Sequence, residues 1–117
     1  MKVERHLISY QEHKETIFDW ALKIKGLKNA QRIVGIHAPR AIIDLLVIYL
    51  LKRDLISPGT QINHRWFKSS KVSERLPEFD NKKKIIEKLV ELELLCEDLT
   101  YGAPKSIIKI KKGNPII

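Results

Sequence analysis

The longest apolar stretch of the chain, residues 29–53, constrains the fold more than any other feature. Apolar side chains occupy most of the circumference that a helix would have here, and such a helix is packed by neighbours on several sides. Pro39 lies inside the stretch, so the helix either kinks there or restarts with the proline in its first turn. We expect one central, buried helix around which the rest of the chain assembles. Its apolar positions are Ile33, Val34, Ile36, Ala41, Ile43, Leu45, Leu46, Ile48 and Leu50.

Further helices are indicated on both sides of this stretch. Residues 9–12, Ser-Tyr-Gln-Glu, form a capping-box pattern, and Gly26 is placed to end the helix that follows. A short helix is expected over 61–69, then a loop over 70–80 with Asp80 as N-cap, and a last helix over 82–99. The expected buried stripe of the first helix is Ile17, Trp20, Ala21, Ile24 and Leu27, and that of the last helix is Ile85, Leu89, Leu92, Cys96 and Leu99.

The C-terminal segment, residues 104–117, alternates enough to form a short edge strand, to dock loosely or to swap onto a partner. No repeat or linker interrupts the chain. The prediction is therefore one domain over 1–117, an all-α, up-down bundle of four to five helices with a short extended tail.

Composition limits the class of protein. The 117 residues are 44% hydrophobic and 31% charged, as in a globular domain. The only cysteine is Cys96, which excludes an intramolecular disulfide and favours a reducing cytoplasm. The N-terminus lacks a signal-peptide core, and the apolar run is interrupted by Asp44 and ends at Lys52, which we take as too short for a bilayer. P-loop, GxGxxG, CxxC and HExxH motifs are absent, so no metal and no cofactor is expected.

The net charge of +8 favours a polyanionic partner, since neutralising phosphates releases counterions. Residues 61–68 interleave basic, polar and aromatic side chains, an arrangement that can hold phosphates and stack on bases. The plainer interpretation is that Trp66 and Phe67 anchor a short helix in the core and leave the charged residues in solvent. We expect a nucleic-acid or nucleotide-binding surface formed by Arg40, His64, Arg65, Lys68 and Lys71, with Arg75 nearby.

Arg32 and His37 are the candidate catalytic pair, because a guanidinium can hold phosphate charge while an imidazole transfers a proton. In a continuous helix, five residues place the two side chains about 140° apart. They converge only if the helix breaks at Gly35 or Pro39, or if two subunits bring copies together. The plainer interpretation is that His37 is a hydrogen-bonded core histidine.

Other polar features have plain explanations as well. Asp44, in the middle of the apolar stretch, would be costly without a partner, and we expect it to face Arg40 or a partner's surface. Lys82, Lys83 and Lys84 could bind phosphate beside a helix N-terminus, although such runs are usually a solvated face.

Residues 32–67, RIVGIHAPRAIIDLLVIYLLKRDLISPGTQINHRWF, resemble the central segment of HEPN domains. In that family an "FHAARALL"-type helix precedes a turn and a "TH…F" segment, places filled here by residues 37–41 and 60–67. The resemblance covers about residues 10–103 and implies a helical bundle that often dimerises and that cleaves RNA, binds nucleotides or accompanies nucleotidyltransferases. Catalytic members carry R-x4-6-H in a late helix with a polar residue after the arginine. Here the match is Arg32 to His37 in an early helix, followed by Ile33, which implies a non-catalytic member.

Three functions stay open from the sequence. The first is a homodimeric, non-catalytic HEPN-like protein that binds RNA or a nucleotide, or that serves as the accessory subunit of a nucleotidyltransferase or toxin–antitoxin system. The second is a winged-helix DNA-binding regulator, with a helix-turn-helix in residues 50–67 and a wing in the tail. The third is a metal-independent HEPN-type RNase that uses Arg32 and His37.

Overall fold

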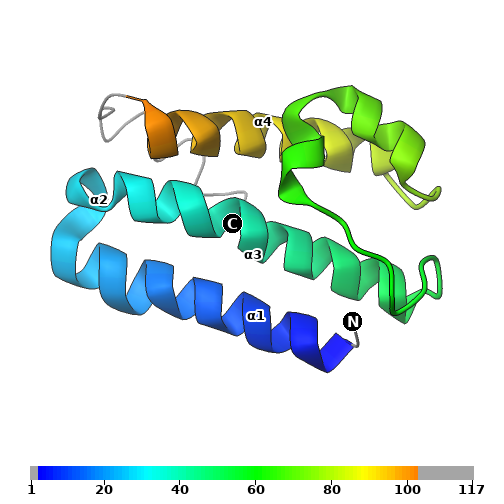
Figure 1. The fold of residues 1–117 in the computed structure, drawn as a ribbon, viewed down its shortest axis with the longest axis horizontal. Helices are drawn as coiled ribbons and strands as arrows, with labels where there is room; N and C mark the ends of the chain where they lie inside the picture. Colours follow the sequence, from blue (N-terminus) through cyan, green and yellow to red (C-terminus); the bar gives the residue numbers. More distant parts are fainter. Residues whose placement is uncertain (1–2, 103–117) are drawn as a thin grey trace.

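The computed structural model describes residues 3–102 (Figure 1). The long helices α1 (Val3–Glu15) with η1 (Thr16–Lys25), α3 (Gln31–Lys52) and α4 (Lys82–Tyr101) lie side by side, and α3 is the middle one. No β-strand occurs within residues 3–102, and the predicted all-α helical bundle is confirmed. The tail expected over 104–117 lies outside the described residues. In chain order the elements are α1 (Val3–Glu15), the π-helix η1 (Thr16–Lys25), α2 (Gly26–Asn29), α3 (Gln31–Lys52), the 3-10 helices η2 (His64–Lys68) and η3 (Ser70–Arg75), and α4 (Lys82–Tyr101).

The first helix begins earlier than its capping-box pattern indicated. α1 starts at Val3, and Ser9 lies inside it. The Ser9 hydroxyl donates to Asp44 Oδ2 on α3 at 2.6 Å, so it makes a tertiary contact and does not cap a helix end. Gly26, with a φ of +78°, does follow the end of η1, as expected.

The π-helical winding of η1 overturns part of the expected buried stripe. Ile17 and Ala21 are buried, but Trp20 is 62% exposed and Ile24 is 67% exposed. A π-helix closes i→i+5 hydrogen bonds in place of i→i+4, so its side chains do not repeat at the α-helical spacing from which the stripe was predicted. The result is an unexpected apolar surface on η1.

The central helix is confirmed almost to the residue. α3 packs against α1 on one side and α4 on the other, and it is continuous through Pro39. At Gly35 the helix lies close against α4: a Cβ at this position would lie 2.5 Å from Thr100 Oγ1 and 2.7 Å from the Cys96 carbonyl oxygen. The core along α3 consists of Val34, Ala38, Ala41, Ile42, Ile43, Leu46, Val47 and Leu50.

By length and composition α3 could also cross a membrane, so the expectation that this run is too short was wrong. More than half of its most apolar stretch is nevertheless buried inside the molecule, as in the core helix of a bundle.

The segment between α3 and α4 is more helical than expected. Phe67 on η2 is 1% exposed, which confirms it as an anchor of the core, and Trp66 packs partly buried beside it. The loop expected over 70–80 contains η3, and α4 begins after Asn81, whose φ is +59°, and not after Asp80. α4 continues to Tyr101, two residues beyond the expected end.

Candidate functional site

A cleft between α3, η2 and α4 brings together Arg40, His64, Arg65 and Lys68, which the sequence nominated for ligand binding. The cleft has a volume of about 160 Å³. A wider hollow of about 560 Å³ adjoins it and shares Arg40, His64 and Arg65. Residues that are far apart in sequence thus converge because η2 folds back over α3 beside α4 (Figure 1). We refer to the smaller cavity as the η2 cleft.

His64 and Glu93 form a hydrogen-bonded pair in the lining of the η2 cleft. His64 Nδ1 lies 2.7 Å from Glu93 Oε1, and the Glu93 side chain is only 6% exposed. Because an ionised carboxylate only accepts, Nδ1 carries the proton and Nε2 is the ring atom left for other contacts. Glu93 was not predicted as a site residue. A charged residue on the apolar stripe of the last helix was the feature of the sequence that could have indicated it.

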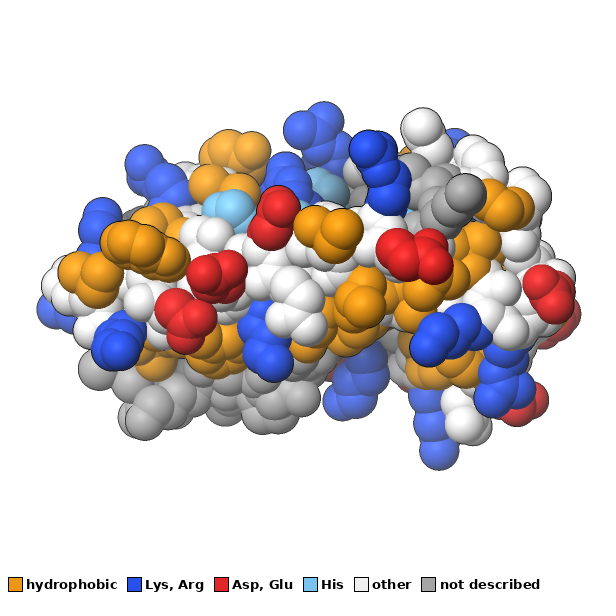
Figure 2. All heavy atoms as spheres, turned by 90° about the horizontal axis from the view of Figure 1, so that it is seen from below, with side chains coloured by type: hydrophobic (Ala, Val, Ile, Leu, Met, Phe, Trp, Pro, Cys, Tyr) orange, Lys and Arg blue, Asp and Glu red, His pale blue; other side chains and the backbone are white. Residues whose placement is uncertain are grey.

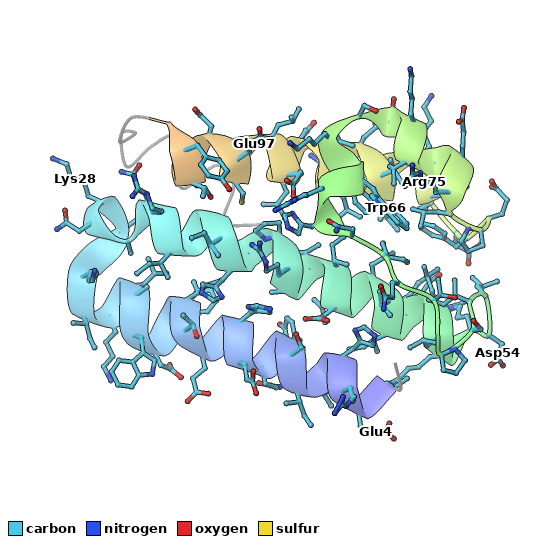
Figure 3. All side chains as sticks on the ribbon, in the orientation of Figure 1. Glu4, Lys28, Asp54, Trp66, Arg75 and Glu97 are labelled. Carbon is cyan, nitrogen blue, oxygen red and sulfur yellow. The ribbon has the colours of Figure 1, made fainter. Side chains whose placement is uncertain are left out.

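Three cationic side chains line the same cleft. The Arg40 Nη1 donates to the Ile36 carbonyl of its own helix, which holds the guanidinium along α3. Arg65 is exposed, and Lys68 pairs with Glu97 across the cleft at 3.6 Å (Figure 3 labels Glu97 on α4). An exposed ion pair of this length is worth little, so Lys68 can exchange its carboxylate for a phosphate.

Tyr101 lies at the edge of the η2 cleft and is 81% exposed. An aromatic ring this exposed contributes little to the core, but it offers a face on which a base can stack. Cys96, one turn before Thr100 in the same helix, is buried, and burial raises the pKa of its thiol to about 12, which makes it a poor nucleophile.

The remaining basic residues of the region do not enter the cleft. Lys71 is exposed and does not line it. The Arg75 guanidinium lies over the Trp66 ring, 4.8 Å from its centroid (Figure 3). Lys82 donates to the carbonyls of Ser73 and Leu76 and to Glu78. Its ammonium group therefore holds the preceding loop and already has three acceptors.

The structure separates Arg32 from His37. α3 does not break, Arg32 lines a different cavity near α2, and His37 faces α1. His37 Nδ1 lies 2.8 Å from His13 Nδ1, so one ring donates and the other accepts. Within one chain the geometry therefore does not assemble the Arg32–His37 pair.

A second polar cluster joins α1 to α3 on this side. His6 Nδ1 lies 2.9 Å from Asp44 Oδ1, and with Ser9 it supplies the partners that Asp44 was expected to find in Arg40 or in another subunit. His6 Nε2 is buried without a hydrogen-bond partner among the described residues. This cluster was not predicted, because a single sequence does not indicate which residues of the first helix face Asp44.

Burial lowers the pKa of both His13 and His37 below the ordinary histidine value. For His37, the neighbouring His13 and then Arg40 lower the pKa further; for His13, Asp44 acts in the opposite direction and Arg40 adds to the lowering. Both rings are therefore neutral at pH 7, which suits a hydrogen-bonded pair in which one ring accepts.

Comparison of the chain with family models, with curated proteins and with solved structures found no match.

Proposed function

We propose that this protein is a non-catalytic, HEPN-like helical bundle that binds phosphate groups of a nucleotide or of RNA in the η2 cleft. The observation that carries the proposal is the convergence of Arg40, Arg65 and Lys68 on one cavity, with the exposed Tyr101 at its edge. Guanidinium groups bind phosphate oxygens in a bidentate manner, and an aromatic face accepts a base. The net charge of +8 would steer a polyanion toward the protein.

The absence of a formed Arg32–His37 pair supports a binding role. His13 and His37 bond to each other on the α1 side of α3.

The test is binding of a fluorescently labelled diuridine nucleotide, followed by anisotropy. The variant R40Q/R65Q should weaken binding at least tenfold, because it removes two charge-assisted phosphate contacts. The matched control is R5Q/K14Q, which removes the same charge from exposed positions of α1. Equal affinity of all three proteins, or no binding by the wild type, would overturn the proposal.

Metal-independent RNA cleavage is the second candidate, and one observation favours it. The His64–Glu93 pair has the arrangement of a general base oriented by a carboxylate, and it lies beside Arg40 and Arg65. Incubation of a labelled RNA 20-mer with chelator tests this candidate. It requires cleavage by the wild type that falls by about 10²-fold or more in H64A, the usual contribution of a general base. If the wild type leaves the RNA intact, this candidate function is ruled out.

The winged-helix alternative has less support. Residues 53–63 form an irregular connection and η2 is a 3-10 helix of five residues, whereas helix-turn-helix proteins insert an α-helix into the major groove. The tail that would form the wing begins where the described residues end.

We also propose that the protein forms a homodimer or acts as the accessory subunit of an enzyme. Hydrophobic side chains gather at one end of the face formed by α1 and η1 (Figure 2, left), where Phe18, Trp20 and Ile24 are exposed. Sedimentation of the wild type and of W20K tests self-association. We expect a dimer that W20K converts to a monomer; a monomeric wild type would leave this face to a different partner chain.

A further inference from the structure

A second basic cavity lies beside the η2 cleft, at the end of the molecule where α2 lies and α4 ends. It has a volume of about 500 Å³, and its cationic lining residues are Lys25, Lys28 and Arg32. All three are exposed, and Lys28 projects outward at this end (Figure 3). No acidic side chain is among the described residues that line it, and the ion pairs formed within residues 3–102 do not involve these three cations. We refer to it as the α2 cavity.

The two cavities meet along α3. Ile36 lines both of them, and Arg32, Ile36 and Arg40 follow one another at intervals of four residues on one side of the helix. At the C-terminal end of α4 the junction is equally direct, because Tyr101 lines the η2 cleft and the next residue, Gly102, lines the α2 cavity. The exposed tyrosine therefore lies in the lining of the η2 cleft, next in sequence to a residue that lines the α2 cavity.

The span of this surface exceeds one nucleotide. Arg32 and Arg40 are eight residues apart, which at 1.5 Å per residue is about 12 Å along the helix axis. With a rise of about 3.4 Å per stacked nucleotide, that distance corresponds to roughly three to four nucleotides of one strand. The η2 cleft alone, at about 160 Å³, is also smaller than the roughly 300–1,000 Å³ of ordinary small-molecule sites.

We propose that the η2 cleft and the α2 cavity form one groove for single-stranded nucleic acid. The inference rests on the proposed function and specifies its ligand. Arg40, Arg65 and Lys68 hold phosphates on one side of Tyr101, Lys25, Lys28 and Arg32 hold phosphates on the other, and an unpaired base stacks on the tyrosine ring. A duplex does not offer an unpaired base face, so it gains only the electrostatic part of the binding.

The experiment measures anisotropy of labelled oligouridine and oligodeoxyuridine of two, four and eight nucleotides, and of an eight-base-pair duplex, with the full chain. For the wild type, affinity should rise steeply between two and four to eight nucleotides, and the single strands should bind more tightly than the duplex. Equal affinity for the two sugars would show that the phosphodiester chain and the bases suffice; a difference would show that the ribose hydroxyl contributes.

K25Q/K28Q/R32Q is the decisive variant. It should weaken binding of the eight-nucleotide strand at least tenfold, reduce the slope of log affinity against log salt by about 2, and leave the dinucleotide unaffected. The matched control, K14Q/K83Q/K84Q, removes the same charge from exposed positions that line neither cavity. A second, uncharged test is Y101A, which should weaken the eight-nucleotide strand about tenfold at every salt concentration.

The outcomes separate this inference from the proposed function. Dinucleotide binding that is lost in R40Q/R65Q but does not strengthen with length would retain the proposed function and overturn the groove. An effect of the control equal to that of K25Q/K28Q/R32Q would reduce the result to net charge, which also overturns it. Preference for the duplex, or wild-type binding of every oligonucleotide by K25Q/K28Q/R32Q, would do the same.

Discussion

Gly35 gives the sharpest test of how α3 and α4 are held together beside the η2 cleft. A methyl group at this position would lie 2.5 Å from Thr100 Oγ1 and 2.7 Å from the Cys96 carbonyl oxygen. The Thr100 side chain is held by its own hydrogen bond to that carbonyl at 2.7 Å, and the carbonyl belongs to the backbone of α4. Neither contact can be relieved by rotating a flexible side chain, so the helices must move apart.

The expected effect of G35A is a net loss of stability. Alanine in a helix interior is favoured over glycine by about 1 kcal/mol. Overpacking against backbone costs about 3 kcal/mol, the upper part of its usual range. The difference is a destabilisation of about 2 kcal/mol, or a fall in Tm of roughly 8 °C for a domain of this size.

Thermal unfolding followed by circular dichroism measures this, and G59A is the matched control. A Cβ at Gly59 would have no heavy atom within 4 Å, and the same exchange there should change Tm little or raise it slightly. G35A/T100A should recover part of the loss, because it removes the nearer of the two contacts. A G35A protein as stable as the wild type would refute the close approach of the two helices.

Three further predictions concern the core and the α1–α3 cluster. D44A should cost about 3 kcal/mol in chemical unfolding, because it leaves the buried His6 and the Ser9 hydroxyl without their acceptor, whereas D80A, at an exposed position, should stay within about 0.5 kcal/mol. F67A should cost about 3–5 kcal/mol and W20A less than 1 kcal/mol, and the reverse order would contradict the exposure of η1. The pKa values of His13 and His37 are lowered in the folded protein, so the unfolded chain binds protons more readily. The stability that this pair contributes is therefore fully present above the ordinary histidine pKa and is lost as the pH drops through and below it. Tm measured from pH 8 to pH 5 should decline less in H13N/H37N than in the wild type, and parallel curves would argue against the pair.

The sequence predicted the parts of the fold that depend on local pattern. The apolar stretch 29–53 indicated α3 because a helix packed on both sides needs apolar residues around most of its circumference. The stripe on the first helix was only half right, since Trp20 and Ile24 follow α-helical spacing and the chain there is wound as a π-helix. The apolar spacing from which the stripe was predicted does not distinguish a π-helix from an α-helix over so short a segment.

The candidate site divides in the same way. Arg40, His64, Arg65 and Lys68 were nominated for their charge and their proximity to aromatic residues, and they line one cleft. Their carboxylate neighbours Glu93 and Glu97 were not nominated, because the facing of α4 toward η2 depends on contacts about 30 residues apart in the chain. The partners of Asp44 were missed for the same reason.

Pro39 has a consequence for how the central rod comes into being. A proline has no amide hydrogen to give to the carbonyl four residues before it, so α3 lacks one bond of its ladder at Gly35. A synthetic peptide of residues 31–52 should therefore break at that point in water, although the same residues are continuous in the protein. α3 packs against α1 on one side and α4 on the other, and we expect this packing to keep it continuous through Pro39 and to make its formation depend on both neighbours.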